Sequence, residues 1–220
     1  GYIMISFKNV SKRYPDGYVA LNNIDLSVEP GEMVFLTGHS GAGKSTLLKL
    51  IAAIERPTSG TITISGQNIA QLKLGAIPYL RRKIGFIFQD HKLLFDRNVF
   101  DNVLLPLQIG SFENHMMVSR VRAALDKVGL LKKEKSMPIA LSGGERQRLC
   151  IARAVVHRPS ILIADEPTGN LDVDYARDIM AMFTSFNQVG VTVLIATHDA
   201  SLLEDTQHRV LSLKQGKLAA

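Results

Sequence analysis

Nine consecutive residues combine the side chains and the backbone freedom that phosphate binding requires. Residues 38–46 read GHSGAGKST, which matches the phosphate-binding pattern G-x-x-x-x-G-K-[ST]. The glycines allow a tight turn in which backbone N–H groups approach phosphate oxygens. Lys44 supplies a positive charge for the β- and γ-phosphates, and the Ser45 hydroxyl is a suitable Mg²⁺ ligand. The candidate nucleotide-contacting residues of this loop are Gly38, His39, Ser40, Gly41, Ala42, Gly43, Lys44, Ser45 and Thr46.

The residues on either side of the loop predict the elements that would hold it. Residues 33–37 (MVFLT) form a short apolar run that is typical of a buried strand, and residues 47–54 (LLKLIAAI) predict a buried helix. The helix would point the positive end of its dipole at the bound anion. The alternative is a glycine-rich turn that binds nothing. A phosphate loop alone predicts a nucleotide but not what the nucleotide is for.

Two polar side chains follow predicted buried strands at their carboxyl ends. Gln89 follows the apolar run 84–88, and His198 follows the run 191–197. Ligands of open α/β sheets bind at this edge. A glutamine at this position can reach a metal ion or the attacking water. The position of His198 at the same edge favours a role at the ligand, although a lone histidine is more often a structural group.

Two adjacent carboxylates end another predicted strand, residues 160–164. Neighbouring buried carboxylates are costly unless they meet a cation or take part in chemistry. We therefore expect Asp165 to hold Mg²⁺ through water and Glu166 to orient and polarise an attacking water. The turn that follows leads to Asp172 and into a helix predicted over residues 172–187.

Two further segments offer contacts of another kind. Tyr14 precedes the phosphate loop, where it is either a base-stacking ring or an ordinary half-exposed turn residue. Residues 141–147 (LSGGERQ) begin a helix, with Ser142 as the N-cap and Glu145 at capping-box spacing. The same hydroxyl, glycines and helix start also form a possible anion site. Both interpretations of this segment remain open.

The remaining pattern predicts strands near both ends of the chain and helices between them. The further strands are expected at residues 4–10, 20–28, 61–64 and 209–213, the last followed by a turn at 215–216 and a short tail. Residues 66–83 are mixed and polar. From residue 90 to 156 the apolar spacing is helical, interrupted at Pro106 and Gly129, which predicts a helical insertion into an α/β core.

Composition narrows the class of protein without deciding its function. The 220 residues predict one domain, and a single cysteine, Cys150, excludes a disulfide framework and favours the cytosol. The net charge of +6 fits nucleic acid, an anionic membrane surface or neither. No apolar run is long enough to span a membrane, and no secretory signal is recognised. We expect the native chain to begin at Met4, with residues 1–3 carried over from expression.

Taken in order, these motifs resemble those of the nucleotide-binding subunits of ABC transporters. The resemblance runs along the chain from Met4 and depends most on residues 141–145 (LSGGE), which other phosphate-loop ATPases lack. It implies an α/β fold of the P-loop NTPase, ABC-ATPase type, with a mixed sheet core, an N-terminal antiparallel β part and an inserted helical subdomain. Within this single domain, residues 1–88 and 157–220 would form the core, and residues 89–156 the helical subdomain carrying the signature motif.

The resemblance also implies a role for each motif. Tyr14 would stack on adenine, Gln89 would sense the γ-phosphate and contact a membrane partner, and Glu166 would be the general base. Asp172 would be the acid of the loop after the carboxylate strand, and His198 would contact the γ-phosphate. Ser142, Gly143, Gly144 and Glu145 would act in trans on the nucleotide of a second copy. The expected catalytic residues are Lys44, Gln89, Glu166 and His198, and the expected Mg²⁺ ligands are Ser45, Gln89 and Asp165.

The implied ligands are ATP and Mg²⁺, and the implied partners are a second copy in an ATP-sandwich homodimer and an integral membrane permease-like subunit. Segments such as residues 38–50 and 88–91 resemble the cell-division branch of the family, which controls septal peptidoglycan hydrolysis across the membrane. We therefore expect a peripheral protein on the cytoplasmic face of the bacterial inner membrane, at the septum, with no nucleic-acid partner. The alternatives are a lipoprotein-releasing or macrolide-exporting ATPase and a soluble ABC ATPase acting on nucleic acid.

Overall fold

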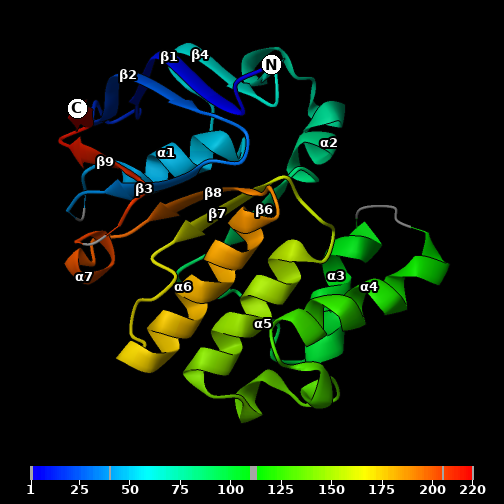
Figure 1. The fold of residues 1–220 in the computed structure, drawn as a ribbon. Coiled ribbons are helices and arrows are strands. Elements are labelled where there is room, and N and C mark those ends of the chain that lie inside the picture. Colours follow the sequence, from blue (N-terminus) through cyan, green and yellow to red (C-terminus); the bar gives the residue numbers. More distant parts are fainter. Residues whose placement is uncertain (1, 40, 110–112, 205, 220) are drawn as a thin grey trace. The chain divides into compact units, whose positions relative to one another are not determined.

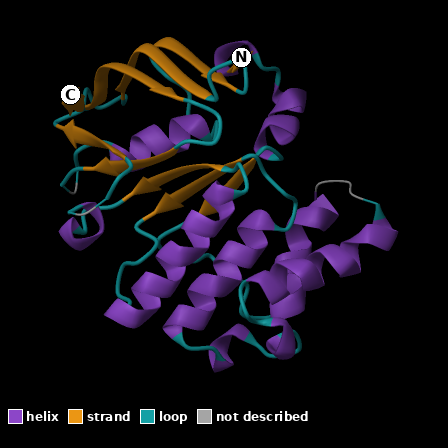
Figure 2. Ribbon diagram, viewed as in Figure 1, coloured by secondary structure: helices purple, strands orange, loops and turns teal. Residues whose placement is uncertain are grey.

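The computed structural model describes residues 2–39, 41–109, 113–204 and 206–219 (Figures 1 and 2). The chain forms two compact units, one of residues 1–81 with 190–220 and the other of residues 82–189. The division expected from the sequence, with a helical subdomain over residues 89–156, stays a prediction. No helix among the described residues is long and apolar enough to cross a membrane.

The first unit contains an antiparallel sheet built from the N-terminal part of the chain. Its strands lie in the order β2-β1-β4-β5. They are β1 (Ile5–Arg13), β2 (Val19–Val28), β4 (Ser59–Ile64) and β5 (Gln67–Asn68). Ile5 pairs with Val28 on one side and with Ile64 on the other, and all three side chains are fully buried. The predicted N-terminal antiparallel part is therefore confirmed, although β1 begins one residue later and ends three residues later than expected.

The same unit holds the strand that leads to the phosphate loop. β3 (Met33–Thr37) pairs in parallel with β8 (Thr192–Ala196) and with β9 (Arg209–Lys214). The short tail expected after residue 216 is instead a strand, β10 (Lys217–Ala219), antiparallel to β9. Gln215 and Gly216 both have positive φ, 50° and 77°. Two such residues make a tight hairpin turn whose twist matches the flanking strands.

Among the described residues of the first unit, three segments are α-helices. They are α1 (Lys44–Ile51), α2 (Ile77–Arg81) and α7 (Ala200–Leu203). The helix expected over residues 47–54 begins earlier and ends earlier, because Ala53 adopts a left-handed backbone with φ 57°. The sequence pattern missed α2 and α7, which are too short to show a helical period. α7 begins where the Asp199 carboxylate accepts a hydrogen bond from the Ser201 N–H at 3.0 Å.

The second unit is mainly helical around one pair of parallel strands. β6 (Ile84–Ile87) pairs with β7 (Ile161–Asp165). The helices are α3 (Val99–Ile109), α4 (Asn114–Lys127), α5 (Gly143–Val155) and α6 (Val173–Gln188). α3 packs against both α4 and α5, and α5 also packs against α6 and β6 (Figure 1). A Cβ on Gly85 would lie 2.3 Å from the Ala154 carbonyl oxygen, so only glycine allows α5 this close to β6.

The expected interruption of a helix at Pro106 is wrong, because Pro106 lies inside α3. The neighbouring side chains of Val103 and Leu107 are fully buried, and their packing holds the helix despite the missing N–H. Gly129 does end a helix: it follows the C-cap of α4 with φ 75°, a conformation that glycine adopts without strain.

Candidate nucleotide site

The glycines of the phosphate loop are required by close backbone approaches. A Cβ on Gly38 would lie 2.5 Å from the Leu213 carbonyl oxygen, and one on Gly43 would lie 2.7 Å from that of Ala20. Gly43 also has φ 107°. Since no side chain fits these contacts, the loop is pressed against the backbone of two strands.

Backbone hydrogen bonds hold the loop from the other end of the chain. The Gly216 N–H donates to the Ala42 carbonyl at 3.1 Å, and the Ala42 N–H donates to the His39 carbonyl at 3.1 Å. The C-terminal hairpin turn thus supports a loop that lies some 170 residues earlier in sequence. Ser40, a predicted contact residue, lies outside the described residues.

The start of α1 follows the loop directly. Gly43 is its N-cap residue and has no side chain to cap the first N–H groups, which suits a helix end that receives an anion. Lys44 is only 8% exposed. Ser45 and Thr46 follow in the first turn of the helix. The strand, loop and helix that the sequence predicts are therefore present, with the helix three residues longer at its start.

Tyr14 lies beside the phosphate-loop helix rather than in open solvent. Its hydroxyl donates to the Glu55 carboxylate at 2.6 Å and lies 3.3 Å from the Thr46 hydroxyl. Burial, followed by the hydrogen bond to Glu55, raises the pKa of Tyr14. Its ring is nearly parallel to that of Tyr18, with centroids 6.4 Å apart, and the Tyr18 hydroxyl donates to the Gly41 carbonyl at 3.1 Å. Sequence reasoning missed Tyr18, whose only signal was its place just after the turn.

His198 and the phosphate loop both lie at the carboxyl ends of parallel strands. β3 and β8 are in register, with Leu36 opposite Ala196. The Thr197 N–H donates to the Leu36 carbonyl at 2.9 Å, so the pairing continues one residue past β8. The loop begins just after β3 and His198 just after Thr197. The first unit therefore brings this histidine and the loop to one edge, as the strand pattern predicts.

In the second unit, Gln89 and Glu166 follow the carboxyl ends of the paired strands β6 and β7. Ile87 pairs with Ala164, so each polar residue lies two positions beyond a paired residue. Glu166 is 9% exposed and has φ 49°. A left-handed backbone is uncommon outside glycine and concentrates at functional sites. The Gly169 N–H donates to the Glu166 carbonyl at 3.1 Å, which closes the turn after the carboxylates.

A buried glutamine on α5 fastens that turn, and sequence reasoning missed it. The Gln147 side chain donates to the Pro167 carbonyl at 2.6 Å and is 2% exposed. A second contact joins α5 to α6. Gly144 of α5 packs so closely on the Tyr175 ring of α6 that a Cβ on this glycine would lie 2.2 Å from the ring. The Asp172 carboxylate caps α6 by accepting from the Tyr175 N–H at 3.0 Å. α5 is therefore joined to both ends of the loop after β7.

The segment after Gln89 is also fastened to α5. His91 and Lys92 have φ of 59° and 50°, and their carbonyls accept hydrogen bonds from Arg153 at 2.5 Å and 2.8 Å. Burial, followed by the positive charges of Arg146 and Arg153, lowers the pKa of His91. One helix thus carries the predicted signature motif at its start and holds the backbone after Gln89 near its end.

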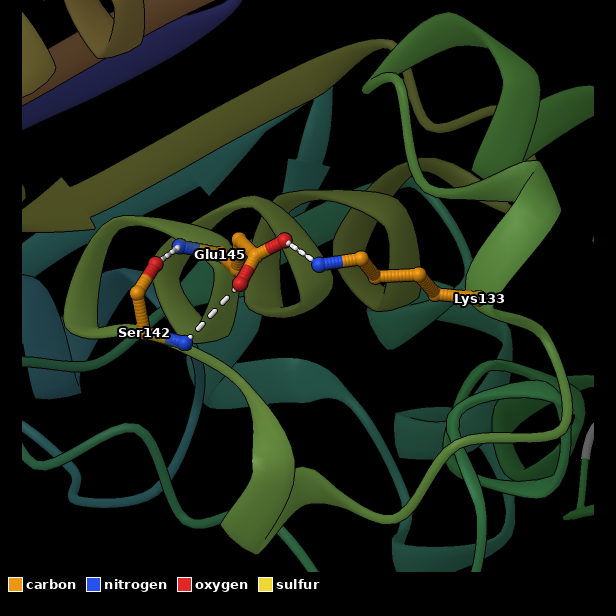
Figure 3. A network of polar contacts seen from close by, with 3 residues as sticks. All are labelled: Lys133, Ser142 and Glu145. Carbon is orange, nitrogen blue, oxygen red and sulfur yellow. Dashed lines mark hydrogen bonds and ion pairs between the residues drawn. The ribbon is translucent and has the colours of Figure 1, made fainter.

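The predicted capping box at the start of α5 is confirmed. The Ser142 hydroxyl accepts from the Glu145 N–H at 3.2 Å, and the Ser142 N–H donates to the Glu145 carboxylate at 2.9 Å. The other carboxylate oxygen of Glu145 is paired with Lys133 (Figure 3). This ion pair, followed by the bond from Ser142, lowers the pKa of Glu145. The cap therefore accounts for the local structure of this motif whether or not it binds an anion.

The predicted site residues fall into two groups, one in each unit. The first unit holds the phosphate loop, Tyr14 and His198. The second unit holds Gln89, Asp165, Glu166, Ser142, Gly143, Gly144, Glu145 and Asp172. Within each group, residues distant in sequence meet through strand pairing or helix packing. Their separate roles remain predictions.

Comparison with known proteins identifies the family to which these motifs belong. The chain matches the ABC transporter family model over residues 21–169. It is 57% identical over 215 residues to the cell division ATP-binding protein FtsE of Escherichia coli (strain K12), covering 98% of this chain and 97% of that protein. It is 44% identical over 213 residues to FtsE of Bacillus subtilis (strain 168), covering 97% and 93%. The resemblance to the cell-division branch is thereby confirmed.

Solved structures agree with the predicted fold. The ATP-binding cassette MJ0796, a dimer in a post-hydrolysis state bound to ADP and Pi, superposes with a TM-score of 0.89 at 34% identity, covering 99% of this chain and 97% of that one. cbiO1 from Clostridium perfringens, part of the ABC transporter complex cbiONQ, gives a TM-score of 0.91 at 29% identity, covering 100% and 88%. The expected P-loop fold of ABC-ATPase type is confirmed. The chain belongs to the ABC transporter family.

Proposed function

We propose that this chain is the ATP-binding and ATP-hydrolysing subunit of an FtsE-type membrane complex. In this complex, ATP-driven dimerisation controls septal peptidoglycan hydrolysis from across the membrane. One observation carries the proposal. A glycine-rich phosphate loop leads directly into α1, in a chain that resembles cell division ATP-binding proteins along nearly its whole length. The other motifs then receive roles around the bound triphosphate.

The phosphate loop and Lys44 would hold the triphosphate. The uncapped start of α1 offers backbone N–H groups, and the buried Lys44 adds a charge with little solvent screening. The ring of Tyr14 would stack on the adenine. Its pairing with the ring of Tyr18 keeps the Tyr14 ring in a fixed orientation. Residues 38–46 would thus provide affinity, and the aromatic pair would provide the base contact.

The predicted metal ligands fit Mg²⁺ by their chemistry. Ser45 offers a hydroxyl, Gln89 an amide oxygen and Asp165 a carboxylate, and Mg²⁺ prefers such hard oxygen ligands. When bound, Mg²⁺ would neutralise charge on the β- and γ-phosphates. This assignment makes hydrolysis dependent on Mg²⁺, which titration of a metal-free preparation would test.

Glu166 would orient and polarise the attacking water. Its left-handed backbone and the turn closed by Gly169 hold it at the end of β7, and the bond from Gln147 to Pro167 fixes the next residue. His198, at the edge that carries the phosphate loop, would contact the γ-phosphate. Gln89 would sense the same group and pass the change to the helices that follow it.

A second copy would complete the site. The ABC cassette MJ0796, which has this fold, was solved as a dimer in two structures, one of them with ADP and Pi bound. The start of α5, with its glycines and Ser142, would face the phosphate held by the partner copy. ATP would then hold the interface closed, and hydrolysis would release it.

The membrane partner would be an integral permease-like subunit of the FtsX type. The chain would accordingly act as a peripheral protein at the cytoplasmic face of the inner membrane, at the septum. A lipoprotein-releasing or macrolide-exporting complex would use the same catalytic residues with another membrane subunit. Only the identity of that subunit separates these functions.

Glu166→Gln tests the catalytic part of the proposal. The variant should bind ATP, accumulate as a dimer and hydrolyse ATP about a hundredfold more slowly or worse, because the water loses its base. Phosphate release and sedimentation with ATP and Mg²⁺ measure these effects. Lys44→Ala is the control that should neither bind ATP nor dimerise. Wild-type turnover in Glu166→Gln would exclude Glu166 as the base.

Capture from membranes tests the biological part. Tagged Glu166→Gln, held with ATP in detergent-solubilised membranes of the source cell, should retain a division permease that mass spectrometry identifies. The Lys44→Ala variant should retain far less of it. Capture of an export permease would replace the proposed biology, and capture of nucleic acid without a membrane protein would point to the soluble class.

A further inference from the structure

We propose that Lys133 is a positioning residue for the signature motif: it offsets the negative charge of Glu145 at the start of α5 and so strengthens the grip of that helix start on the nucleotide of a second copy. The inference rests on the proposed function, in which α5 receives a phosphate in trans. It goes further by assigning an electrostatic role to a residue outside every predicted motif.

The three residues form one network (Figure 3). Both carboxylate oxygens of Glu145 are used, one by the Ser142 N–H at 2.9 Å and the other by the Lys133 ammonium. The Glu145 side chain is 20% exposed and that of Lys133 is 47% exposed. The carboxylate is therefore held at the helix start in one orientation, with its charge partly compensated.

Lys133 is held where it can do this. It ends a short helical turn, Leu131–Lys133, that follows the buried Leu130. The Lys133 N–H donates to the Leu130 carbonyl at 2.9 Å, and the Lys133 carbonyl accepts from the Ser136 N–H at 3.0 Å. The next residue, Glu134, is paired with Arg122 at 3.3 Å. A backbone bonded on both sides limits the entropy lost when the long side chain meets Glu145.

The charge of Glu145 has opposite effects on the free subunit and on the dimer. In the free subunit a carboxylate in the first helical turn is favourable, because it caps an N–H and complements the helix dipole. In the dimer the same carboxylate would repel a triphosphate arriving at the same N–H groups. Lys133 keeps the capping geometry while reducing the net charge that the phosphate meets.

A purely structural role for Lys133 makes a different prediction. If the lysine only fastened its turn to α5, removing it would weaken the dimer whether or not residue 145 carries a charge. If it acts on charge, Glu145→Gln should remove the need for it. The glutamine oxygen can still accept from the Ser142 N–H, so the cap survives the change.

The experiment is a double-variant cycle in the full chain carrying Glu166→Gln. The ATP concentration that gives half-maximal dimer is measured by sedimentation with Mg²⁺ for Lys133→Met, Lys133→Arg, Glu145→Gln and the combination of Lys133→Met with Glu145→Gln. Lys132→Met is the matched control, because it removes the same charge from the exposed neighbouring position. Thermal unfolding of each variant reports any loss of stability.

Lys133→Met should raise the half-maximal ATP concentration about three- to tenfold, and less than about twofold when Glu145→Gln is present. Lys133→Arg should restore most of the loss, Lys132→Met should have little effect, and added salt should shrink the defect. An equal defect with and without Glu145→Gln, or no defect at all, would overturn the inference. Failure of the Glu166→Gln parent to dimerise would instead count against the proposed function.

Discussion

The phosphate loop and the start of α5 are two helix starts built in different ways. The loop is shaped by backbone packing: Gly38 and Gly43 press against main-chain carbonyls, and no side chain caps α1. The start of α5 is shaped by side chains, with a capping box from Ser142 and Glu145 and an ion pair to Lys133. The first should therefore respond most strongly to steric changes, whereas the second should respond to changes of charge and hydrogen bonding and show a smaller steric effect.

The largest effect should come from Gly43→Ala in the phosphate loop. The new Cβ would lie 2.7 Å from the Ala20 carbonyl oxygen at a residue with φ 107°, so backbone must move. We expect ATP binding to fall about a hundredfold or more, because a displacement of the loop of about 1 Å removes its alignment. Nucleotide titration by fluorescence or calorimetry measures this.

Gly41→Ala is the matched control for that prediction. Gly41 also has positive φ, 82°, but its Cβ would meet no described atom within 4 Å. Its cost should be limited to about 1 kcal/mol of backbone strain, with ATP still bound. Equal losses of binding in the two variants would show that backbone conformation, rather than close approach, governs the loop.

A smaller steric effect is expected where α5 meets α6. In Gly144→Ala the new Cβ would lie 2.2 Å from the Tyr175 ring, whereas in Gly143→Ala the nearest described atom is the Leu171 side chain at 3.9 Å. Because a ring can shift more easily than a strand, we expect Gly144→Ala to cost about 1–3 kcal/mol of stability. Gly143→Ala should cost much less. Thermal or urea unfolding compares the two.

Tyr175→Leu tests the cause of that difference. The smaller side chain should give part of the stability back to Gly144→Ala, since it removes the ring that the Cβ strikes. If the combined variant is no more stable than Gly144→Ala alone, the ring contact does not explain the cost. That result would mean that polar contacts alone determine the structure at the start of α5.

The smallest effect should be a pH dependence confined to the second unit. His157 donates from Nε2 to the Ile84 carbonyl at 3.1 Å, while its buried Nδ1 has no partner among the described residues. Burial lowers the pKa of His157. The unfolded chain therefore binds a proton first, so this contribution to stability is present above about pH 6.5 and is lost as pH falls below it.

Melting temperature measured between about pH 7.5 and 5.5 should thus fall by a few degrees for the wild type. It should fall less for His157→Gln, whose amide can still donate to the carbonyl but does not titrate. Hydrogen exchange should place the acid loss in residues 82–189. A loss that appears first around the phosphate loop would contradict the assignment to His157.

The local sequence pattern correctly predicted much of this molecule. The run 33–37 is β3 to the residue, and the capping box at Ser142 forms as its spacing predicts. These features depend on residues within a few positions of one another, so a single segment contains all the information needed. The phosphate loop belongs to the same class, since its glycines and lysine are adjacent.

Other features depend on contacts between distant segments, and only the tertiary structure decided them. Pro106 stays inside α3 because buried neighbours hold the helix, and Tyr14 is aligned by Tyr18 and Glu55 across a turn and a helix. Gln147 reaches Pro167 from another element. Such contacts leave no periodic trace in the sequence, because their energy depends on where folding brings two segments together.

The sequence by itself therefore determined the glycine-rich loop between β3 and α1 and the family, and it predicted the residues that we propose act on a triphosphate. The tertiary structure decided which further residues position these groups. Lys133 pairs with Glu145 at the start of α5, Arg153 bonds the backbone just after Gln89, and the Gly216 N–H bonds the phosphate loop. The physical reason is that chemistry requires particular residue types at short spacing, whereas positioning requires only a suitable donor, charge or shape delivered from anywhere in the fold.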